Sequence, residues 1–351
     1  MVDWVRNPHR GQGLPGPGPL PLDDPEGVRA LLDLCPADAE TPLRDLPALA
    51  RELGIAALML KDERARMGLG SFKALGAAHA IAREAAEVVH KGKADWANAL
   101  EGRTYITASA GNHGLSVAAG ARLFGARAVV VLAETVPDAF AARLQAKGAR
   151  VLRRGATYES SMDAAEQEAA AQGWTLLSDS SWPGYTEQPT RVMEGYLQMA
   201  AEITGQAGRP PSHILLQAGV GGLAAAVAAH ARRAWGDAPV VVVVEPAAAP
   251  ALIDSIRAGA LVTADGPVSS MGRLDCKTPS MIALAGLARD ADLFVTVSED
   301  EAARAVTRLA AHGIATTPSG AAGLAALFAG LPDLPPEARV LAIVSEAPED
   351  G

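Results

Sequence analysis

The stretch MGLGSFKALGA, from Met67 to Ala77, stands between a short apolar run and a long helical pattern. Gly68 and Gly70 permit backbone torsions that other residues avoid, and Ser71 is a candidate N-cap for the helix that follows. Lys73 then falls in the first helical turn, where the helix dipole and the apolar neighbours, Phe72 among them, disfavour an ammonium ion. The local sequence therefore predicts a neutral, nucleophilic lysine that forms imines.

Composition limits the classes of protein to which the chain can belong. Its 351 residues suffice for one large or two ordinary domains, and with 49% hydrophobic residues it has no apolar run of membrane-spanning length. The first residues, MVDWVRNPHR, do not form a secretory signal, so we expect a soluble, cytoplasmic protein with no membrane partner. A net charge of −9 without a basic cluster argues against a nucleic-acid partner. Cys35 and Cys276 lack metal-ligand spacing, so no metal site is expected.

Strand and helix patterns alternate along the chain, which is typical of parallel sheets covered on both faces. The sequence predicts two open, mostly parallel α/β sheets and a Pro/Gly-rich extended arm over residues 11–25, packed on the domain or on a partner subunit. The expected strands are 56–60, 104–108, 128–132, 150–152, 213–217, 240–244, 293–297 and 340–344. The expected helices are 46–53, 73–90, 115–124, 138–147, 187–203, 223–235, 250–258, 300–312 and 320–328.

Three further segments lie where open sheets bind ligands, at the carboxyl ends of strands. Gln217 to Leu223, QAGVGGL, is a glycine turn that suits a phosphate, although a tight turn with no ligand has the same sequence. Ser109 to Gly114, SAGNHG, offers the amide of Asn112, whereas His113 has either a catalytic or a structural role. Ser345 follows the last apolar strand and could bond a ring nitrogen.

In this order, SFKALGA, SAGNHG, AGVGG and the late serine resemble the motifs of fold type II pyridoxal-phosphate enzymes, the threonine and serine dehydratase and tryptophan synthase β group. Within this group, the closer resemblance is to diaminopropionate ammonia-lyase. The stretches that carry this similarity are KDERARMGLGSFKALGA (61–77), DSSWPGYTEQPT (179–190), AGVGGLAAAV (218–227), MGRLDCKTPS (271–280) and PSGAAGLAAL (318–327).

The resemblance implies a role for each motif. Lys73 would hold pyridoxal 5'-phosphate covalently, Asn112 would bond the phenolate oxygen of its ring, and Ser345 would face the pyridine nitrogen. The implied cofactor-binding set also contains Phe72, Gly219, Val220, Gly221, Gly222 and Leu223, and the implied substrate-binding set contains Ser109, Ala110, Gly111, His113 and Tyr185. It further implies a homodimer, with a large domain from 1–63 and 186–351, including an N-terminal arm from 1–25, and a small domain from 64–185.

Asp179 stands where the ammonia-lyases have an aspartate that serves as acid or base for the L-substrate. Partial desolvation by Trp182 and Tyr185 predicts a raised pKa for this carboxyl, although an aspartate that orders a turn would look the same. The family's second aspartate, assigned to the D-substrate, is replaced by Ala110, and Glu346-Ala347-Pro348-Glu349 replaces the family's Glu-Gly-x-Thr.

These features predict α,β-elimination from a small β-substituted amino acid in amino acid metabolism. The leading substrate is L-2,3-diaminopropionate, which would give pyruvate and ammonia, with Lys73 and Asp179 as the catalytic residues. A serine or threonine dehydratase and a β-replacement enzyme are the alternatives within enzymes. A catalytically idle relative that binds pyridoxal phosphate is the alternative outside them.

Overall fold

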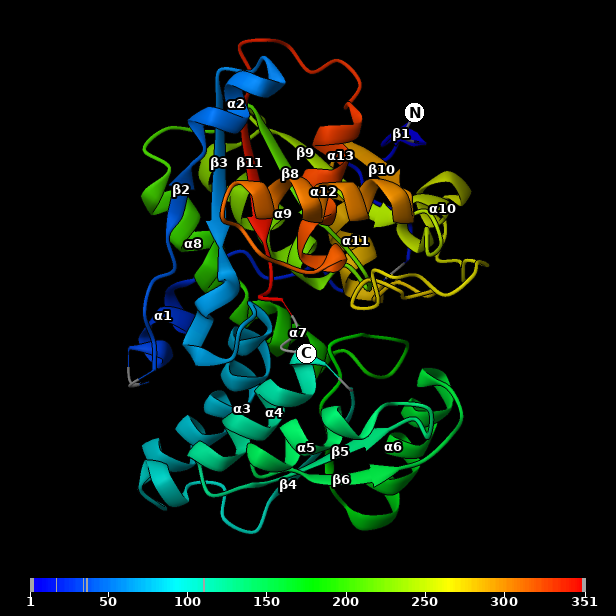
Figure 1. The fold of residues 1–351 in the computed structure, drawn as a ribbon. Coiled ribbons are helices and arrows are strands. Elements are labelled where there is room, and N and C mark those ends of the chain that lie inside the picture. The colour runs from blue at the N-terminus through cyan, green and yellow to red at the C-terminus, as the bar shows by residue number, and fades with distance from the viewer. Residues whose placement is uncertain (1–2, 17, 34, 36, 110, 349–351) are drawn as a thin grey trace.

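The computed structural model describes residues 3–16, 18–33, 35, 37–109 and 111–348, and their strands form two sheets. Figure 1 shows the sheets in two lobes, one above the other, with the strands of the upper lobe running towards the lower one. The seven-stranded sheet has the order β1-β10-β9-β8-β11-β3-β2, and the four-stranded sheet has the order β6-β5-β4-β7. The expected pair of α/β sheets is confirmed.

The seven-stranded sheet is parallel except for its two edge strands, β1 and β2, which pair antiparallel with β10 and β3. Both faces are covered, so its strands are apolar along their length. Val242 and Val244 pack with one set of helices, including α12 and α13, whereas Val241 and Val243 pack with the helices of the other face. The strands are β1 (Trp4–Arg6), β2 (Leu43–Asp45), β3 (Ala57–Asp62), β8 (His213–Gln217), β9 (Val240–Pro246), β10 (Leu293–Val297) and β11 (Arg339–Val344).

The four-stranded sheet is entirely parallel. Val129 and Val131 face α6, and Val130 and Leu132 join the core formed with α3, α4 and α5. Its strands are β4 (Thr104–Ala108), β5 (Arg127–Leu132), β6 (Arg150–Arg153) and β7 (Thr175–Leu176). The strands of the two sheets fall within the two proposed domains, although the boundaries at residues 63/64 and 185/186 stay a prediction.

The helices connect and cover these strands. They are α1 (Glu26–Leu32), α2 (Pro47–Leu53), α3 (Lys73–His90), α4 (Asn112–Leu123), α5 (Asp138–Ala146), α6 (Tyr158–Gln172), α7 (Glu187–Gly195), α8 (Leu197–Gln206), α9 (Gly222–Trp235), α10 (Ala251–Ala258), α11 (Met281–Asp290), α12 (Glu299–Ala311) and α13 (Pro318–Ala329). The 3-10 helices Glu63–Gly68 and Trp96–Asn98 complete the set among the described residues.

Sequence patterns missed β1, β2, α1, α6, β7 and α11. The single helix expected over residues 187–203 is wrong, because α7 and α8 meet at a break at Tyr196. The described part of the 11–25 segment has no helix or strand, as expected, and it lies on α9 and α11 of its own chain. Pro21 fills the space beside Gly286, and the backbone oxygen of Asp23 lies 3.0 Å from His230 Nδ1.

Within the described ranges, no helix is both long enough and apolar enough to cross a membrane.

Candidate active site

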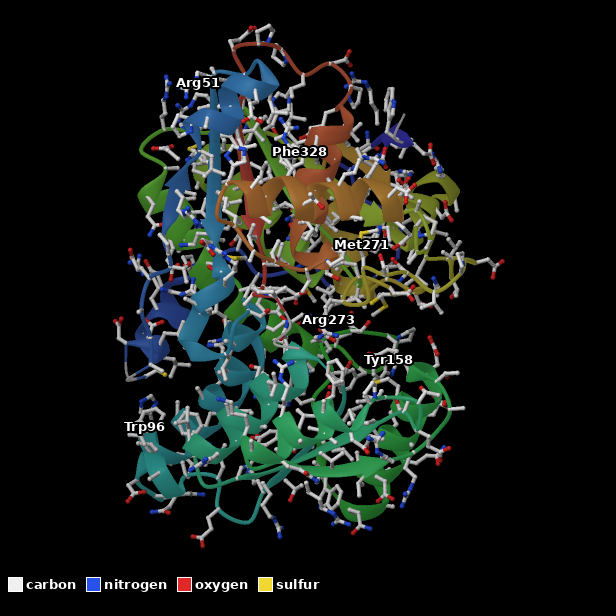
Figure 2. All side chains as sticks on the ribbon, in the orientation of Figure 1. Arg51, Trp96, Tyr158, Met271, Arg273 and Phe328 are labelled. Carbon is white, nitrogen blue, oxygen red and sulfur yellow. The ribbon has the colours of Figure 1, made fainter. Side chains whose placement is uncertain are left out.

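A cavity of about 350 Å³ gathers the motifs that are distant in the sequence. It is lined by residues from the lysine, asparagine and glycine segments, by the loop at Asp179, and by the end of β11. Tyr158 from the lower lobe and Arg273 from the upper lobe both lie at the level where the lobes meet (Figure 2). The predicted site residues that line it are Phe72, Lys73, Ser109, Gly111, Asn112, His113, Asp179, Gly219, Val220, Gly221, Gly222, Leu223 and Ser345.

Lys73 is the first residue of α3, and the segment before it is fastened to the end of β11. The backbone nitrogen of Phe72 donates to the oxygen of Ser345 at 3.1 Å, and that of Ala347 donates to the oxygen of Gly70 at 2.8 Å. The prediction of Ser71 as the N-cap is wrong, because the N-cap of α3 is Phe72, although Ser71 Oγ accepts from the backbone nitrogen of Lys73 at 3.3 Å. These bonds place the lysine opposite the last strand.

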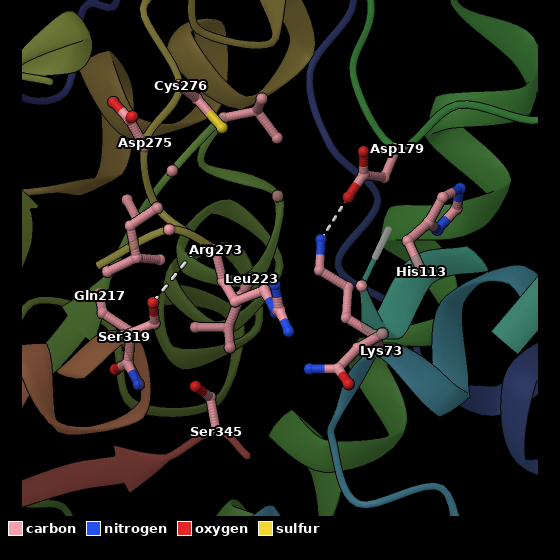
Figure 3. Close-up of a pocket in the computed structure, with 18 of the residues that line it drawn as sticks. Lys73, His113, Asp179, Gln217, Leu223, Arg273, Asp275, Cys276, Ser319 and Ser345 are labelled. Atoms are coloured by element: carbon pink, nitrogen blue, oxygen red, sulfur yellow. Dashed lines mark hydrogen bonds and ion pairs between the residues drawn. The ribbon is translucent and has the colours of Figure 1, made fainter. Parts of the chain in front are cut away.

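Lys73 Nζ donates to Asp179 Oδ2, and the two side chains point towards one another (Figure 3). Both are largely buried, with 20% and 16% of their surfaces exposed. Burial is the largest single influence on Lys73 and lowers its pKa, but the charge of Asp179 and the hydrogen bond to it raise that pKa by more. The prediction of a neutral lysine is therefore wrong for the protein in this state, because the carboxylate of Asp179 stabilises an ammonium ion.

The prediction of a raised pKa for Asp179 is wrong for the same reason. Burial raises the pKa of this carboxyl, as the sequence suggested, but the charge of Lys73 and the hydrogen bond to Lys73 lower it by more. Asp179 is therefore ionised near neutral pH.

Tyr185 supports the Asp179 loop from behind and is absent from the cavity lining. Its hydroxyl donates to the oxygen of Leu176 at 2.9 Å and accepts from the backbone nitrogen of Ser178 at 3.0 Å. Its ring stacks on Trp182 with centroids 4.4 Å apart. The predicted substrate contact by Tyr185 is therefore not supported, and the residue instead orders the turn that carries Asp179.

The asparagine segment begins α4 and reaches across to the end of β11. Asn112 Nδ2 donates to Glu346 Oε2, and Thr317 Oγ1 donates to the other carboxylate oxygen of Glu346. His113 is buried, its Nε2 lies 2.8 Å from the oxygen of Leu177, and burial lowers its pKa. A neutral ring that donates to a carbonyl favours the structural role over the catalytic one. Ala110 lies outside the described residues.

The glycine turn lies between β8 and α9. Gly221 has φ +97°, and a Cβ on Gly219 would come within 3.1 Å of Arg273 O, Cys276 Sγ and Leu274 Cα, so a larger residue would force these neighbours to shift. Helix α9 runs for 14 residues from Gly222, and the backbone N–H groups of its first turn are available to an anion.

Some lining residues had no predicted role. Ser319 Oγ accepts from the backbone nitrogen of Arg273 at 3.1 Å, and this bond joins two loops of the upper lobe (Figure 3). Arg273 and Ser319 lie in the stretches 271–280 and 318–327, which carry the family resemblance. The resemblance therefore marked both segments, but no function was predicted for either residue. The remaining such residues are Tyr158, Gln217, Ala218, Val268, Ser269, Gly272, Leu274, Asp275, Cys276 and Glu346.

The donor set fits pyridoxal phosphate. Lys73 supplies an amine for an aldehyde, the glycine turn supplies space and N–H groups for a phosphate, and Ser345 supplies a neutral hydroxyl at the end of β11. Within the described ranges no cluster of three or more His, Cys, Asp or Glu side chains could hold a metal ion.

Comparison with known proteins agrees with this assignment. Residues 34–346 match the family described as pyridoxal-phosphate dependent enzyme. The diaminopropionate ammonia-lyase of Escherichia coli strain K12 is 32% identical over 305 residues, which cover 82% of this chain and 77% of that protein. A Mus musculus protein named serine dehydratase-like is 29% identical over 294 residues, which cover 83% of this chain and 82% of that protein.

The fold matches as well. The crystal structure of Escherichia coli diaminopropionate ammonia lyase in complex with an aminoacrylate-PLP azomethine reaction intermediate has a TM-score of 0.87 and 28% identity, and the match covers 100% of this chain and 94% of that one. The resemblance, the fold class and the cofactor inferred from the motifs are therefore confirmed. The chain belongs to the pyridoxal-phosphate dependent enzyme family, among the relatives of diaminopropionate ammonia-lyase.

Proposed function

We propose that this protein catalyses α,β-elimination of ammonia from L-2,3-diaminopropionate, which yields pyruvate and a second ammonia. The observation that carries the proposal is the pairing of Lys73 with Asp179 inside the cavity that holds the family's cofactor motifs. The ammonia-lyase relatives named above support the choice of substrate.

Pyridoxal phosphate, when bound, supplies a ring that withdraws electrons from the substrate Cα. Lys73 would hold it through its amine, and the turn from Gly219 to Gly222 would bind its phosphate at the start of α9. Asn112 would bond the phenolate oxygen, with its amide oriented by the carboxylate of Glu346. Ser345 would offer the ring nitrogen a hydroxyl, which favours eliminations over transamination because a neutral group does not keep that nitrogen protonated.

The Lys73 and Asp179 side chains supply the base and the acid. An ionised Asp179 Oδ2 or a neutral Lys73 Nζ accepts the proton from Cα, and an ammonium at Nζ returns a proton to the departing β-nitrogen. The bond from Cβ to nitrogen breaks with its electron pair on nitrogen, so ammonia leaves as a neutral molecule. The side chains of Phe72 and Leu223 shield this region from water.

The L-isomer is proposed as the favoured substrate because Asp179 is present whereas the family's second aspartate is replaced by Ala110. Comparable turnover of the D- and L-isomers would contradict the weight given to that replacement.

A dehydratase acting on serine or threonine is the second candidate, and the serine dehydratase-like relative favours it. A β-replacement enzyme remains a third, since the same cavity would serve the addition of a thiol or amine. Product analysis with an added nucleophile separates replacement from elimination.

The holoenzyme tests the proposal directly. It is incubated with L- and D-diaminopropionate, L-serine, L-threonine and hydroxyaspartate, and 2-oxo acid is measured through coupled reduction. We expect the highest kcat/KM with L-diaminopropionate and no turnover by Lys73→Ala. Highest turnover of serine or threonine would favour the dehydratase, and no turnover of any amino acid would favour the idle relative.

We further propose that the protein works in the cytoplasm as a homodimer, as the resemblance implies. Sedimentation of the holoenzyme at micromolar concentration tests the second statement, which a monomer would contradict.

A further inference from the structure

Tyr196 lies at the break between α7 and α8, directly behind the lysine of the candidate site. The side chain is 1% exposed, and its ring meets that of Phe72 edge-on with centroids 4.9 Å apart. Lys73 Nζ is 5.8 Å from the centre of the Tyr196 ring. No sequence motif contains Tyr196, which interrupts the single helix expected over residues 187–203.

Two glycines hold the phenol in this place. A Cβ on Gly76 would lie 2.6 Å from Tyr196 Cε1 and 2.9 Å from its Oη, and a Cβ on Gly195 would lie 2.4 Å from the oxygen of Leu75. Gly76 is three residues after Lys73 and therefore shares its face of α3. The hydroxyl is thus fixed beside the turn of the helix from which the lysine projects.

The hydroxyl is buried, and its contact with Lys73 does not reach the geometry of a full hydrogen bond; no other described residue bonds it. Buried tyrosine hydroxyls are usually bonded, so this one has unused bonding capacity. Burial raises the pKa of Tyr196 to about 12, against the opposing charge of Lys73, so the group stays protonated near neutral pH. It therefore offers one donor and two acceptor sites close to Nζ.

The two neighbours of Nζ differ in what they can bind. The carboxylate of Asp179 only accepts hydrogen bonds and thus favours an ammonium ion, whereas the hydroxyl of Tyr196 can also donate to the lone pair of a neutral amine. A lysine that acts as a nucleophile or a base must be neutral. The geometry provides each protonation state with its own partner.

We propose that Tyr196 is a positioning residue, which receives Lys73 Nζ when that nitrogen leaves Asp179 and holds it as a neutral amine. The assignment rests on the proposed function only where it concerns elimination, since attachment of the cofactor also requires a neutral Lys73. No covalent bond is made or broken by Tyr196 itself.

Other titratable groups also lie around Lys73 and Tyr196. His113 and Cys276 face Lys73 together with Asp179. Beyond Gly195, His79 Nε2 lies 3.0 Å from Glu194 Oε2, and Arg83 donates to the same oxygen, so the charge of Glu194 is already paired.

The test compares Tyr196→Phe with Tyr105→Phe, a matched removal of a buried hydroxyl that is distant from the site. Tyr105 is fully buried in β4, and its hydroxyl donates to Glu84 Oε2 at 2.8 Å. The first measurement is the rate at which the cofactor-free protein takes up pyridoxal phosphate as a function of pH, followed by absorbance. The second is kcat and KM for elimination, and the third is the melting temperature.

In Tyr196→Phe the neutral amine of Lys73 loses a partner, so the pKa of Lys73 should rise. We expect the uptake rate to increase at a pH roughly one unit higher than in the wild type, which equals a rate about tenfold lower at a given pH. We expect kcat to fall by a similar factor with KM little changed, and the melting temperature to be unchanged or higher, since no bond is lost. Tyr105→Phe should lower the melting temperature and leave the uptake profile in place.

An uptake profile of Tyr196→Phe that matches the wild type would overturn the role of Tyr196, as would a variant that fails to fold, because the hydroxyl would then have had a structural partner. If the wild type eliminates nothing from any amino acid, the proposed function fails, while the uptake profile still decides on Tyr196.

Discussion

Glu202 lies at the centre of a buried ionic network just ahead of the catalytic segment, and replacing it with glutamine should destabilise the protein. Glu202 Oε2 accepts from Lys61 Nζ and from Arg66 Nη2, each at 2.6 Å, and Oε1 accepts from Arg66 Nη1 at 2.8 Å. All three side chains are at most 2% exposed. Since Arg66 begins the turn that leads to Lys73, the network fixes the approach to the site.

The size of the effect follows from which charge loses its partner. Arg66 keeps two bonds of 2.8 Å to Glu63, but Lys61 is left with the oxygen of Thr41 and the amide oxygen of Gln206. Removing one member of a buried ion pair costs about 3–5 kcal/mol because the other charge stays buried. We expect Glu202→Gln to lose that amount of unfolding free energy, a large part of the 5–15 kcal/mol typical of a folded protein.

The loss should depend on pH. Burial raises the pKa of Glu202, but the hydrogen bonds and charges of Arg66 and Lys61 lower it by more. The pKa therefore lies below the ordinary value of 4.5. A carboxyl with a depressed folded pKa contributes stability that is complete above its unfolded pKa and is lost as the pH falls through the folded one. The wild type and Glu202→Gln should therefore differ most near neutral pH and converge in acid.

Guanidinium unfolding at pH 7 and pH 3.5, followed by circular dichroism, measures both statements. Glu187→Gln is the matched control, because Glu187 is 74% exposed and pairs with Arg191 at 2.8 Å, an arrangement that contributes less than about 1 kcal/mol. Combining Lys61→Met with Glu202→Gln should recover part of the lost unfolding free energy, because the unpaired buried charge of Lys61 is then removed. A loss below about 1 kcal/mol in Glu202→Gln at pH 7 would refute the reasoning.

Other predictions concern the site itself. Asp179→Asn should lower kcat for L-diaminopropionate by roughly a hundredfold or more and shift cofactor uptake to lower pH, because burial, the largest influence on Lys73, then lowers its pKa without the opposing carboxylate. An unshifted uptake profile would contradict the ion pair. Gly219→Ala should weaken pyridoxal phosphate binding at least about tenfold, measured by equilibrium dialysis, since the added Cβ has contacts at 3.1 Å. Gly205→Ala, with nothing within 4 Å of the added Cβ, is its control, and equal losses of affinity in both variants would contradict phosphate binding by the glycine turn.

Several features of the site could be predicted from sequence because they coincide with element boundaries. The glycine turn follows a five-residue buried strand, Ser345 follows another, and Lys73 begins a long helix, so local patterns located them. Helices α6 and α11 were missed. For α6 a usable signal existed, since Thr157 and Ser160 form a capping box, but its small and polar residues give almost no amphipathic pattern.

Charge states could not be predicted in the same way. Lys73 and Asp179 are 106 residues apart, and each was judged from its own neighbours. Local burial and the helix dipole argued for a neutral amine, and local burial argued for a carboxyl with a raised pKa. Contact between the two reverses both conclusions, because a charge partner a hydrogen bond away outweighs desolvation in each case. A pKa inferred from sequence therefore holds only when the residue has no charged partner from elsewhere in the fold.

This reversal bears on catalysis as well as on prediction. The pair favours an ammonium at Nζ and a carboxylate at Oδ2, and it holds one shared proton whose transfer exchanges the roles of acid and base. Elimination needs that exchange, because one proton must be taken from Cα and another given to the β-nitrogen. The ionised carboxylate favours the charged lysine, so a separate partner would stabilise the neutral amine while Asp179 is ionised. Tyr196 is the described residue whose buried hydroxyl is placed to provide it.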